Sequence, residues 1–159
     1  MPNRSLGHFD LIVMGAGSAG ACAAIAAARS GSKVLVIDRL PFIGGTSSAV
    51  LDTFYGFYTP GEKAKKIVGG IPDDVVNGLK KFGSMIERPN TYGAGTGVTY
   101  NAEHLKVVWE SLIIKSGAKI LLHSLLQQVK VLDGRVQELI LATRAGLCSV
   151  TGDFFIDAT

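Results

Sequence analysis

The chain has 159 residues, enough for one layered domain, since chains of about 150 residues bury roughly 68–70% of the surface they expose when unfolded. A net charge of +3, with only 18% of residues charged and the basic ones scattered, disfavours nucleic-acid binding. The two cysteines lie far apart, with no CxxC and no histidines at ligand spacing. We therefore expect no metal site, no dithiol, and a reducing, cytoplasmic setting.

The first 40 residues predict a strand, a helix and a second strand. Residues 9–14 are apolar and bounded by glycine, residues 18–30 are rich in alanine and end at Gly31, and residues 33–38 form another apolar run. Leu11 to Ala28 carries no charge, but its glycines and its many alanines favour this unit over a membrane span or signal peptide. A strand-helix-strand unit of this length predicts parallel strands with a right-handed crossover.

The middle of the chain is less regular. Residues 39–70 predict a long irregular segment, and a helix starts at Pro72 and runs through "IPDDVVNGLKKFGSM". "TYGAGTGVTY" predicts a glycine-rich loop that ends in a short strand. Asn101 then caps a helix with apolar residues at 105, 108, 109, 112 and 113, and residues 118–122 predict a third parallel strand.

From Leu125 the pattern changes to antiparallel strands. Asp133-Gly134 is a two-residue hairpin signal, and Arg144 to Gly146 marks a second turn. We expect three strands in a meander, followed by a separate final strand, Phe154 to Ile156. The predicted fold is therefore α/β: a Rossmann-like parallel sheet with crossover helices, plus an antiparallel three-stranded β-meander.

The sequence "GAGSAG", Gly15 to Gly20, matches GxGxxG and stands between a predicted buried strand and a predicted helix. In that context Gly15 permits a tight turn, Gly17 lets the backbone approach a pyrophosphate, and Gly20 lets the helix pack on the strand. The N–H groups at the start of the helix favour phosphates. The loop therefore predicts dinucleotide binding.

Asp38 ends the second strand, about 20 residues after the first glycine of the loop. A carboxylate there accepts hydrogen bonds from the ribose hydroxyls of an adenosine and repels a 2′-phosphate. We expect the neighbouring Arg39 to point to solvent or to stack near the adenine.

Taken in order along the whole chain, these segments resemble the FAD-dependent oxidoreductases with a glutathione-reductase-type FAD-binding domain. The resemblance is to the branch near the fumarate reductase and succinate dehydrogenase flavoproteins. It rests on "DLIVMGAGSAGACAAIAAARSGSKVLVID", "IGGTSS", "GVTYNAEHLKVVWE" before "SGAKILLHS", and the final "FIDAT".

The resemblance implies FAD as the cofactor and a set of residues that would hold it. The loop would bind the pyrophosphate, Asp38 and Arg39 would lie at the adenosine, and "GGTS" would lie along the phosphates toward the flavin. Leu126 would contact the adenine through its backbone, and Ala158 and Thr159 match the first half of a turn that approaches the cofactor. The predicted cofactor residues are Gly15, Ala16, Gly17, Ser18, Ala19, Gly20, Asp38, Arg39, Gly44, Gly45, Thr46, Ser47, Leu126, Ala158 and Thr159.

Two departures from the family refine this expectation. Thr46 and Ser47 stand where some fumarate reductase-like members carry a flavin-linked histidine, so the FAD is expected to be non-covalent. The cysteine pair of the disulfide reductases is absent from the sequence, and no catalytic residue is assigned.

The resemblance therefore predicts the FAD-binding N-terminal portion of an oxidoreductase that transfers hydride or electrons to or from a small-molecule substrate. We expect residues 1–159 to be one FAD-binding domain truncated at its C-terminal end, with the insert at about 39–100 facing a second domain from the rest of the enzyme. An NAD-binding domain of a dehydrogenase and a non-catalytic nucleotide-binding module remain alternatives.

Overall fold

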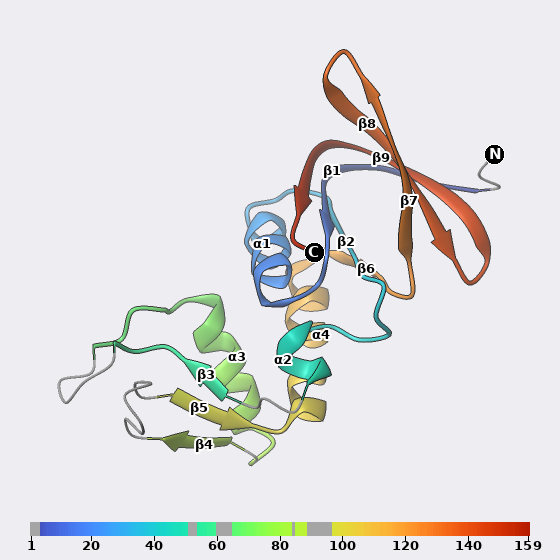
Figure 1. Cartoon of the computed structure of the whole chain (residues 1–159). Coiled ribbons are helices and arrows are strands. Elements are labelled where there is room, and N and C mark those ends of the chain that lie inside the picture. Colours follow the sequence, from blue (N-terminus) through green and yellow to red (C-terminus); the bar gives the residue numbers. More distant parts are fainter. Residues whose placement is uncertain (1–3, 51–53, 60–64, 84, 89–96) are drawn as a thin grey trace. The chain divides into compact units, whose positions relative to one another are not determined.

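The computed structural model describes residues 4–50, 54–59, 65–83, 85–88 and 97–159. The chain divides into two compact units, one made of Met1–Gly45 with Ile113–Thr159 and the other of Thr46–Leu112. Figure 1 labels the elements of both units.

The first unit is built on a six-stranded sheet with the order β6-β2-β1-β9-β8-β7. Strands β6, β2, β1 and β9 run parallel, whereas β8 is antiparallel to both β9 and β7. This arrangement confirms the predicted α/β class, with a parallel sheet that continues into a meander. The strands are β1 (Arg4–Met14), β2 (Val34–Ile37), β6 (Lys119–Leu121), β7 (Leu125–Leu132), β8 (Arg135–Thr143) and β9 (Gly146–Asp157).

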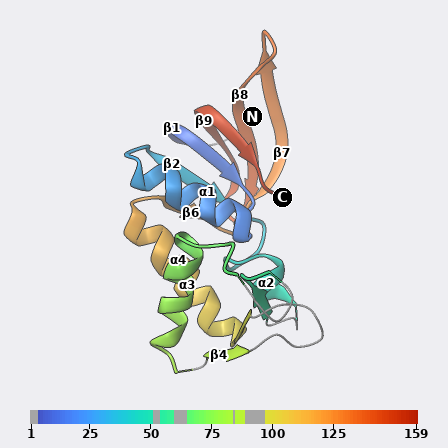
Figure 2. The ribbon, with the colours of Figure 1, turned by 90° about the vertical axis from the view of Figure 1, so that its left-hand side faces the viewer.

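Helix α1 (Ser18–Arg29) packs against β1 and β2 (Figure 2). Gly20, Ala21 and Ala24 are buried on this face together with Ile25, so the helix can approach the sheet closely. A second set of apolar side chains forms one buried cluster that joins the parallel strands to the meander. Its buried members are Phe9, Ile12, Leu35, Ile37, Leu139, Leu141, Cys148 and Val150.

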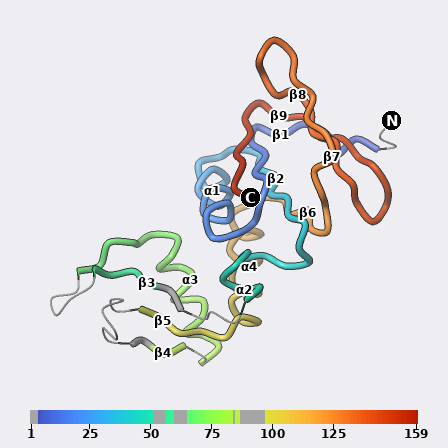
Figure 3. The backbone as a smooth tube through the Cα atoms, in the orientation of Figure 1, coloured from blue at the N-terminus to red at the C-terminus, as the bar shows by residue number. Residues whose placement is uncertain are grey.

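The expected break between the third meander strand and a separate final strand is wrong. β9 is one continuous strand, antiparallel to β8 over its first half and parallel to β1 along nearly its whole length (Figure 3). Gly152 lies inside β9, where an added Cβ would be 3.0 Å from Cδ1 of Ile12. This glycine therefore permits close packing and does not mark a turn.

β1 also differs from the expectation, because it starts at Arg4 and not near Phe9. The polar first residues become a strand by pairing with the start of β9, as in Arg4 with Cys148, with a register shift between Ser5 and His8. Pairing partners more than 100 positions away in the sequence thus decided this boundary.

The second unit contains a small antiparallel sheet with the order β3-β5-β4. We expected an irregular segment up to Gly70 and a helix that continued to Met85. The helix instead ends at Lys80, Gly83 adopts a φ of +67°, and β4 then pairs with β5. The elements are α2 (Thr46–Ala49), β3 (Phe54–Gly56), α3 (Ile71–Lys80), β4 (Met85–Arg88), β5 (Gly97–Tyr100) and α4 (Ala102–Ser116), the last of which continues into the first unit.

Helix α4 begins where the sequence predicts. The side chain of Asn101 accepts hydrogen bonds from the backbone N–H groups of Glu103 and His104, at 2.8 and 3.3 Å. Four of its five predicted apolar positions are buried and Leu112 is half-buried. The buried four are Leu105, Val108, Trp109 and Ile113.

Candidate functional site

The glycine loop between β1 and α1 is held by the end of β9. Gly15 has a φ of +94°, and its N–H donates to the carbonyl of Ile37 at 2.8 Å. A Cβ added to Gly15 would lie 2.5 Å from the carbonyl oxygen of Ala158. Any larger residue at this position would therefore push the end of β9 away from the loop.

Gly20 lies in the first turn of α1, directly against the same loop. A Cβ built on it would be 1.9 Å from the carbonyl oxygen of Gly15 and 3.2 Å from the side chain of Ala158. No L side chain fits there without a backbone shift, so Gly20 fixes the contact between the helix and the loop.

Gly17 differs from both of these glycines, because a Cβ there would have its nearest neighbour at 3.9 Å, the Cα of Gly45. Gly17 is the N-cap of α1, it supplies no side-chain cap, and the first turn of the helix carries no acidic residue. The start of a helix carries a partial positive charge, which favours an anion. The surroundings of Gly17 thus combine open space with an environment suited to a phosphate.

A second glycine pair lies beside the loop. The N–H of Gly44 donates to the carbonyl of Ala16 at 2.9 Å, and Gly44 forms an isolated parallel bridge with Gly17. Gly45 has a φ of +54°, and a Cβ on it would be 2.8 Å from the Cα of Gly17. The two glycines of the "GG" motif therefore allow this backbone segment to lie close to Gly17.

Asp38 lies at the carboxyl end of β2 and is 8% exposed. One carboxylate oxygen accepts the N–H of Ala16 at 2.6 Å, and the other accepts the N–H of Leu40 at 2.8 Å. A carboxylate offers about four acceptor positions, so each oxygen can still take a hydroxyl donor. Arg39 next to it is exposed, as one of the two expected orientations requires.

The connection from β6 to β7 lies beside Asp38. The N–H of Ser124 donates to the carbonyl of Asp38 at 3.0 Å, and the N–H of His123 donates to the carbonyl of Leu40 at 3.2 Å. Leu126 follows two residues later, at the start of β7, with 36% of its surface exposed. The structure therefore brings the predicted adenine and ribose residues to one edge of the sheet.

The end of β9 reaches the same edge, where the N–H of Ala158 donates to the carbonyl of Met14 at 2.8 Å. The sequence analysis did not single out Asp157, whose carboxylate accepts both the hydroxyl of Thr159, at 2.7 Å, and its N–H, at 3.1 Å. These two hydrogen bonds lower the pKa of Asp157, with the hydroxyl as the larger cause. The spacing of an Asp two residues before a Thr is a local signal for such a turn.

Two predicted residues belong to the other compact unit. Thr46 and Ser47 follow Gly45 directly in the chain and form the start of α2. Within that unit the hydroxyl of Tyr100 donates to the carbonyl of Ser47 at 3.0 Å. Their contact with a cofactor stays a prediction.

Neither a metal cluster nor a cysteine pair is found among the described residues. The described residues include no group of three or more His, Cys, Asp and Glu side chains able to hold a metal ion. Cys22 and Cys148 are free thiols, and burial raises the pKa of each. None of the described helices is long and apolar enough to cross a membrane.

The glycine loop and Asp38 follow the carboxyl ends of the parallel strands β1 and β2, the second glycine pair lies beside the loop, and the final turn follows β9. Open α/β sheets bind their ligands at this end of their strands. The family model described as "FAD dependent oxidoreductase" matches residues 10–159. The chain belongs to this family. Its cofactor is therefore FAD, and the alternative of an NAD-binding domain is disfavoured.

Curated proteins similar to this chain include two named "Fumarate reductase (cytochrome)" from Shewanella frigidimarina. Each is 38% identical to it over 80 residues, half of this chain. The chain spans only 14% and 13% of their lengths.

Several solved structures share the fold at lower sequence identity. An open conformation of a flavocytochrome c3 fumarate reductase gives a TM-score of 0.66 at 18% identity, covering 96% of this chain and 34% of that one. A geranylgeranyl bacteriochlorophyll reductase-like protein from Thermoplasma acidophilum gives 0.70 at 18% identity, with 96% and 39% covered. The myxobacterial FAD-dependent halogenase CndH gives 0.67 at 17% identity, with 96% and 37% covered.

The geometry of this edge fits an FAD. Open space at Gly17 and an uncapped helix start suit the pyrophosphate, and the spare acceptor positions of Asp38 suit ribose hydroxyls. A bound flavin supplies the hydride or electron transfer, while the protein binds and orients it.

Proposed function

We propose that this edge of the first unit holds the adenosine and pyrophosphate of a non-covalently bound FAD. The residues at Gly15–Gly20 would receive the pyrophosphate, Asp38 and Arg39 the adenosine, and Gly44–Ser47 the part toward the flavin. Leu126, Ala158 and Thr159 would contact the cofactor through the backbone. The observation that carries this proposal is the space beside Gly17, at the start of a helix that supplies neither a side-chain cap nor an acid of its own.

We also propose that the substrate of the oxidoreductase is a small molecule, and that residues from the rest of the enzyme bind it. Support comes from the relatives, which are several times longer than this chain. Two free cysteines support a reducing cytoplasmic setting. No described residue is assigned a catalytic role.

The direct test is to purify the chain, add FAD, remove the excess and record the absorbance spectrum. Retained flavin bands that are released by heat or acid support non-covalent binding, whereas flavin that stays on the denatured protein contradicts it. Titration with ADP isolates the adenosine and pyrophosphate contacts from any contribution of Thr46 and Ser47.

A matched pair of substitutions tests the role of Asp38. Asp38→Asn keeps the size of the side chain but replaces one carboxylate oxygen with a donor, so ADP affinity should fall by roughly tenfold or more, because hydrogen bonds to charged groups contribute about 1.5–3 kcal/mol. Asp133→Asn makes the same change in the β7–β8 turn and should leave the affinity unchanged. Equal ADP affinity in the original protein and in both variants would show that Asp38 does not bind the ribose.

A further inference from the structure

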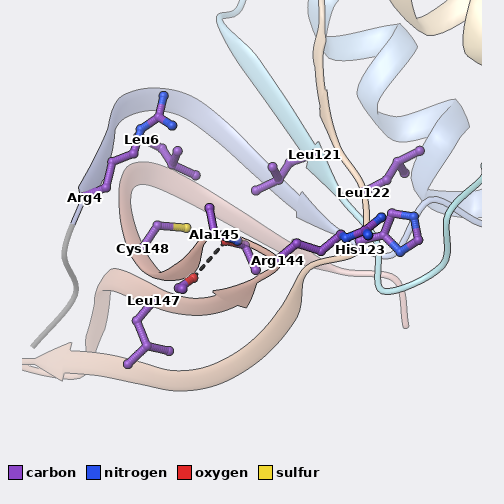
Figure 4. A pocket seen from close by; sticks show the side chains of 11 residues that line it. Arg4, Leu6, Leu121, Leu122, His123, Arg144, Ala145, Leu147 and Cys148 are labelled. Atoms are coloured by element: carbon purple, nitrogen blue, oxygen red, sulfur yellow. Dashed lines mark hydrogen bonds between the residues drawn. The ribbon is translucent and has the colours of Figure 1, made fainter.

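The first unit also contains a cavity, which shares His123 with the edge described above. Its volume is about 290 Å³, and it lies between the start of β1, the end of β6 and the β8–β9 turn (Figure 4). None of the proposed FAD residues lines it. Small-molecule pockets typically occupy roughly 300–1,000 Å³, so this cavity has room for a small ligand.

Most of the cavity wall is apolar. Leu6 and Leu121 are half-buried and also pack on the buried cluster of the first unit, so the cavity reaches the edge of that core. Cys148, which is 4% exposed, also lines the cavity. An apolar body of a ligand would be removed from water here.

The rim is positively charged. Arg144 extends toward the end of the cavity that His123 lines, and Arg4 lies at the opposite end (Figure 4). No described residue lining the cavity is acidic, and neither guanidinium has an ion pair or a side-chain hydrogen bond among the described residues. An arginine in this position is suited to a carboxylate, which it can bind through two parallel hydrogen bonds.

Arg144 also joins the cavity to a more open depression. His123, Thr143 and Arg144 line both spaces, and the depression adds Arg39 and Ser124 but no acidic side chain. His123, which lines both spaces, adopts a φ of +53°, and its N–H donates to the carbonyl of Leu40 at 3.2 Å. A ligand could therefore place an apolar body in the cavity and an anionic group at its cationic mouth.

We propose that this cavity binds a small amphiphilic carboxylate, with its apolar body against Leu6 and Leu121 and its carboxylate on Arg144. The site goes beyond the proposed FAD function. Charge complementarity selects the head group, and the apolar wall selects the body.

Octanoate is the probe, titrated into the 159-residue chain by calorimetry. Saturable binding is expected for octanoate, while acetate, octanol and octylammonium should bind at least roughly tenfold more weakly, since acetate lacks the body and the other two lack the anion. Phenylpropanoate in parallel distinguishes an aryl from an alkyl body. Equal binding of octanol or octylammonium would overturn the proposal, because the cavity would then be a non-selective apolar surface.

Arg144→Gln should weaken octanoate binding by roughly tenfold or more, because it removes a charge-assisted contact. Arg135→Gln is the matched control, since Arg135 lines neither space, and it should stay within roughly twofold of the original protein. An unchanged affinity in folded Arg144→Gln contradicts the assignment of the head group.

Alkylation of the original protein gives a readout that needs no variant. Octanoate should slow the labelling of Cys148 but not of Cys22, as measured by peptide mass mapping. ADP should have no effect on Cys148 and should not displace octanoate. Displacement by ADP would overturn the proposal, because the cavity would then belong to the FAD site.

Discussion

Helices α1 and α3, one in each compact unit, differ in how their N-termini are completed. At α3 the carboxylate of Asp73 accepts the N–H of Gly70 at 2.9 Å and also binds the side chain of Lys66. Both N-caps, Gly17 of α1 and Gly70 of α3, are glycines that supply no side-chain hydrogen bond, but α3 carries two acidic residues in its first turn and α1 carries none. The start of α3 is thus complemented by its own carboxylates, whereas α1 leaves its start available to an anion.

The same two helices also use an internal glycine for different reasons. A Cβ on Gly20 of α1 would meet the backbone carbonyl oxygen of Gly15 at 1.9 Å, whereas a Cβ on Gly78 of α3 would meet Cγ1 of Val108 at 2.6 Å. A backbone neighbour cannot be trimmed by mutation, but a side chain can. The contact at Gly20 therefore constrains the site far more strongly than the contact at Gly78 constrains its helix.

The largest effect is expected for Gly20→Ala. The methyl group must displace α1 from the glycine loop, so the free energy of unfolding should fall by about 3 kcal/mol or more, the upper end of the range for overpacking. Urea denaturation followed by circular dichroism measures the change. A loss below about 1 kcal/mol would mean that the loop yields easily and that Gly20 does not fix it.

Gly17→Ala, only three residues away, should instead affect binding. The new methyl has its nearest protein neighbour at 3.9 Å, so the protein should keep its unfolding midpoint. ADP affinity should fall by roughly tenfold or more, because the methyl occupies space proposed for the pyrophosphate, and a clash of that kind costs about 1–3 kcal/mol. Calorimetric titration gives the affinity. Retained affinity in the alanine variant and in Gly17→Val would contradict the proposed position of the phosphates.

Gly78→Ala should lower stability by about 1 kcal/mol, since overpacking against Val108 exceeds the gain in helix propensity. In a Val108→Ala background the clash is removed, so the same substitution should become stabilising by up to about 1 kcal/mol. Denaturant midpoints of the four proteins in this cycle give the sign. The contrast between α3 and α1 would break down if the substitution were equally destabilising in both backgrounds.

The smallest effect is expected for the pH dependence of the stability that Asp73 contributes at the start of α3. The hydrogen bond from Lys66, followed by the one from Gly70, lowers the pKa of Asp73 from its usual 3.8. A carboxyl with a lowered folded pKa contributes stability above its unfolded pKa and loses it as the pH falls through the folded value. The stability difference between the original protein and Asp73→Asn should thus be constant above about pH 5 and shrink below pH 3.8. A stability difference that stayed constant below pH 3.8 would contradict this pKa shift.

Local sequence predicted much of the fold because the decisive interactions are short in range. The Asp133-Gly134 turn forms with φ values of +50° and +72°, as the dipeptide predicts, and Asn101 caps α4 through neighbours two and three residues away. The glycine loop with Asp38 was likewise predicted from a strand, a turn and a helix in sequence. Propensity alone missed the continuous β9, because its pairing with β1 joins residues that are remote along the chain. It also missed β4, which pairs with the nearby β5, because the helical pattern was extended through Met85.

The sequence by itself determined the strand-loop-helix unit, the dinucleotide motif and the hairpin, because each is encoded by residue types at fixed local spacing. Only the tertiary structure separated Gly17, which leaves space for a ligand, from Gly15 and Gly20, whose missing side chains are required by backbone atoms of Ala158 and of the loop itself. The cavity at Arg144 is likewise absent from any local pattern, since its lining comes from three segments between residues 4 and 148. Packing brings these segments together, and packing depends on contacts that no short stretch of sequence contains.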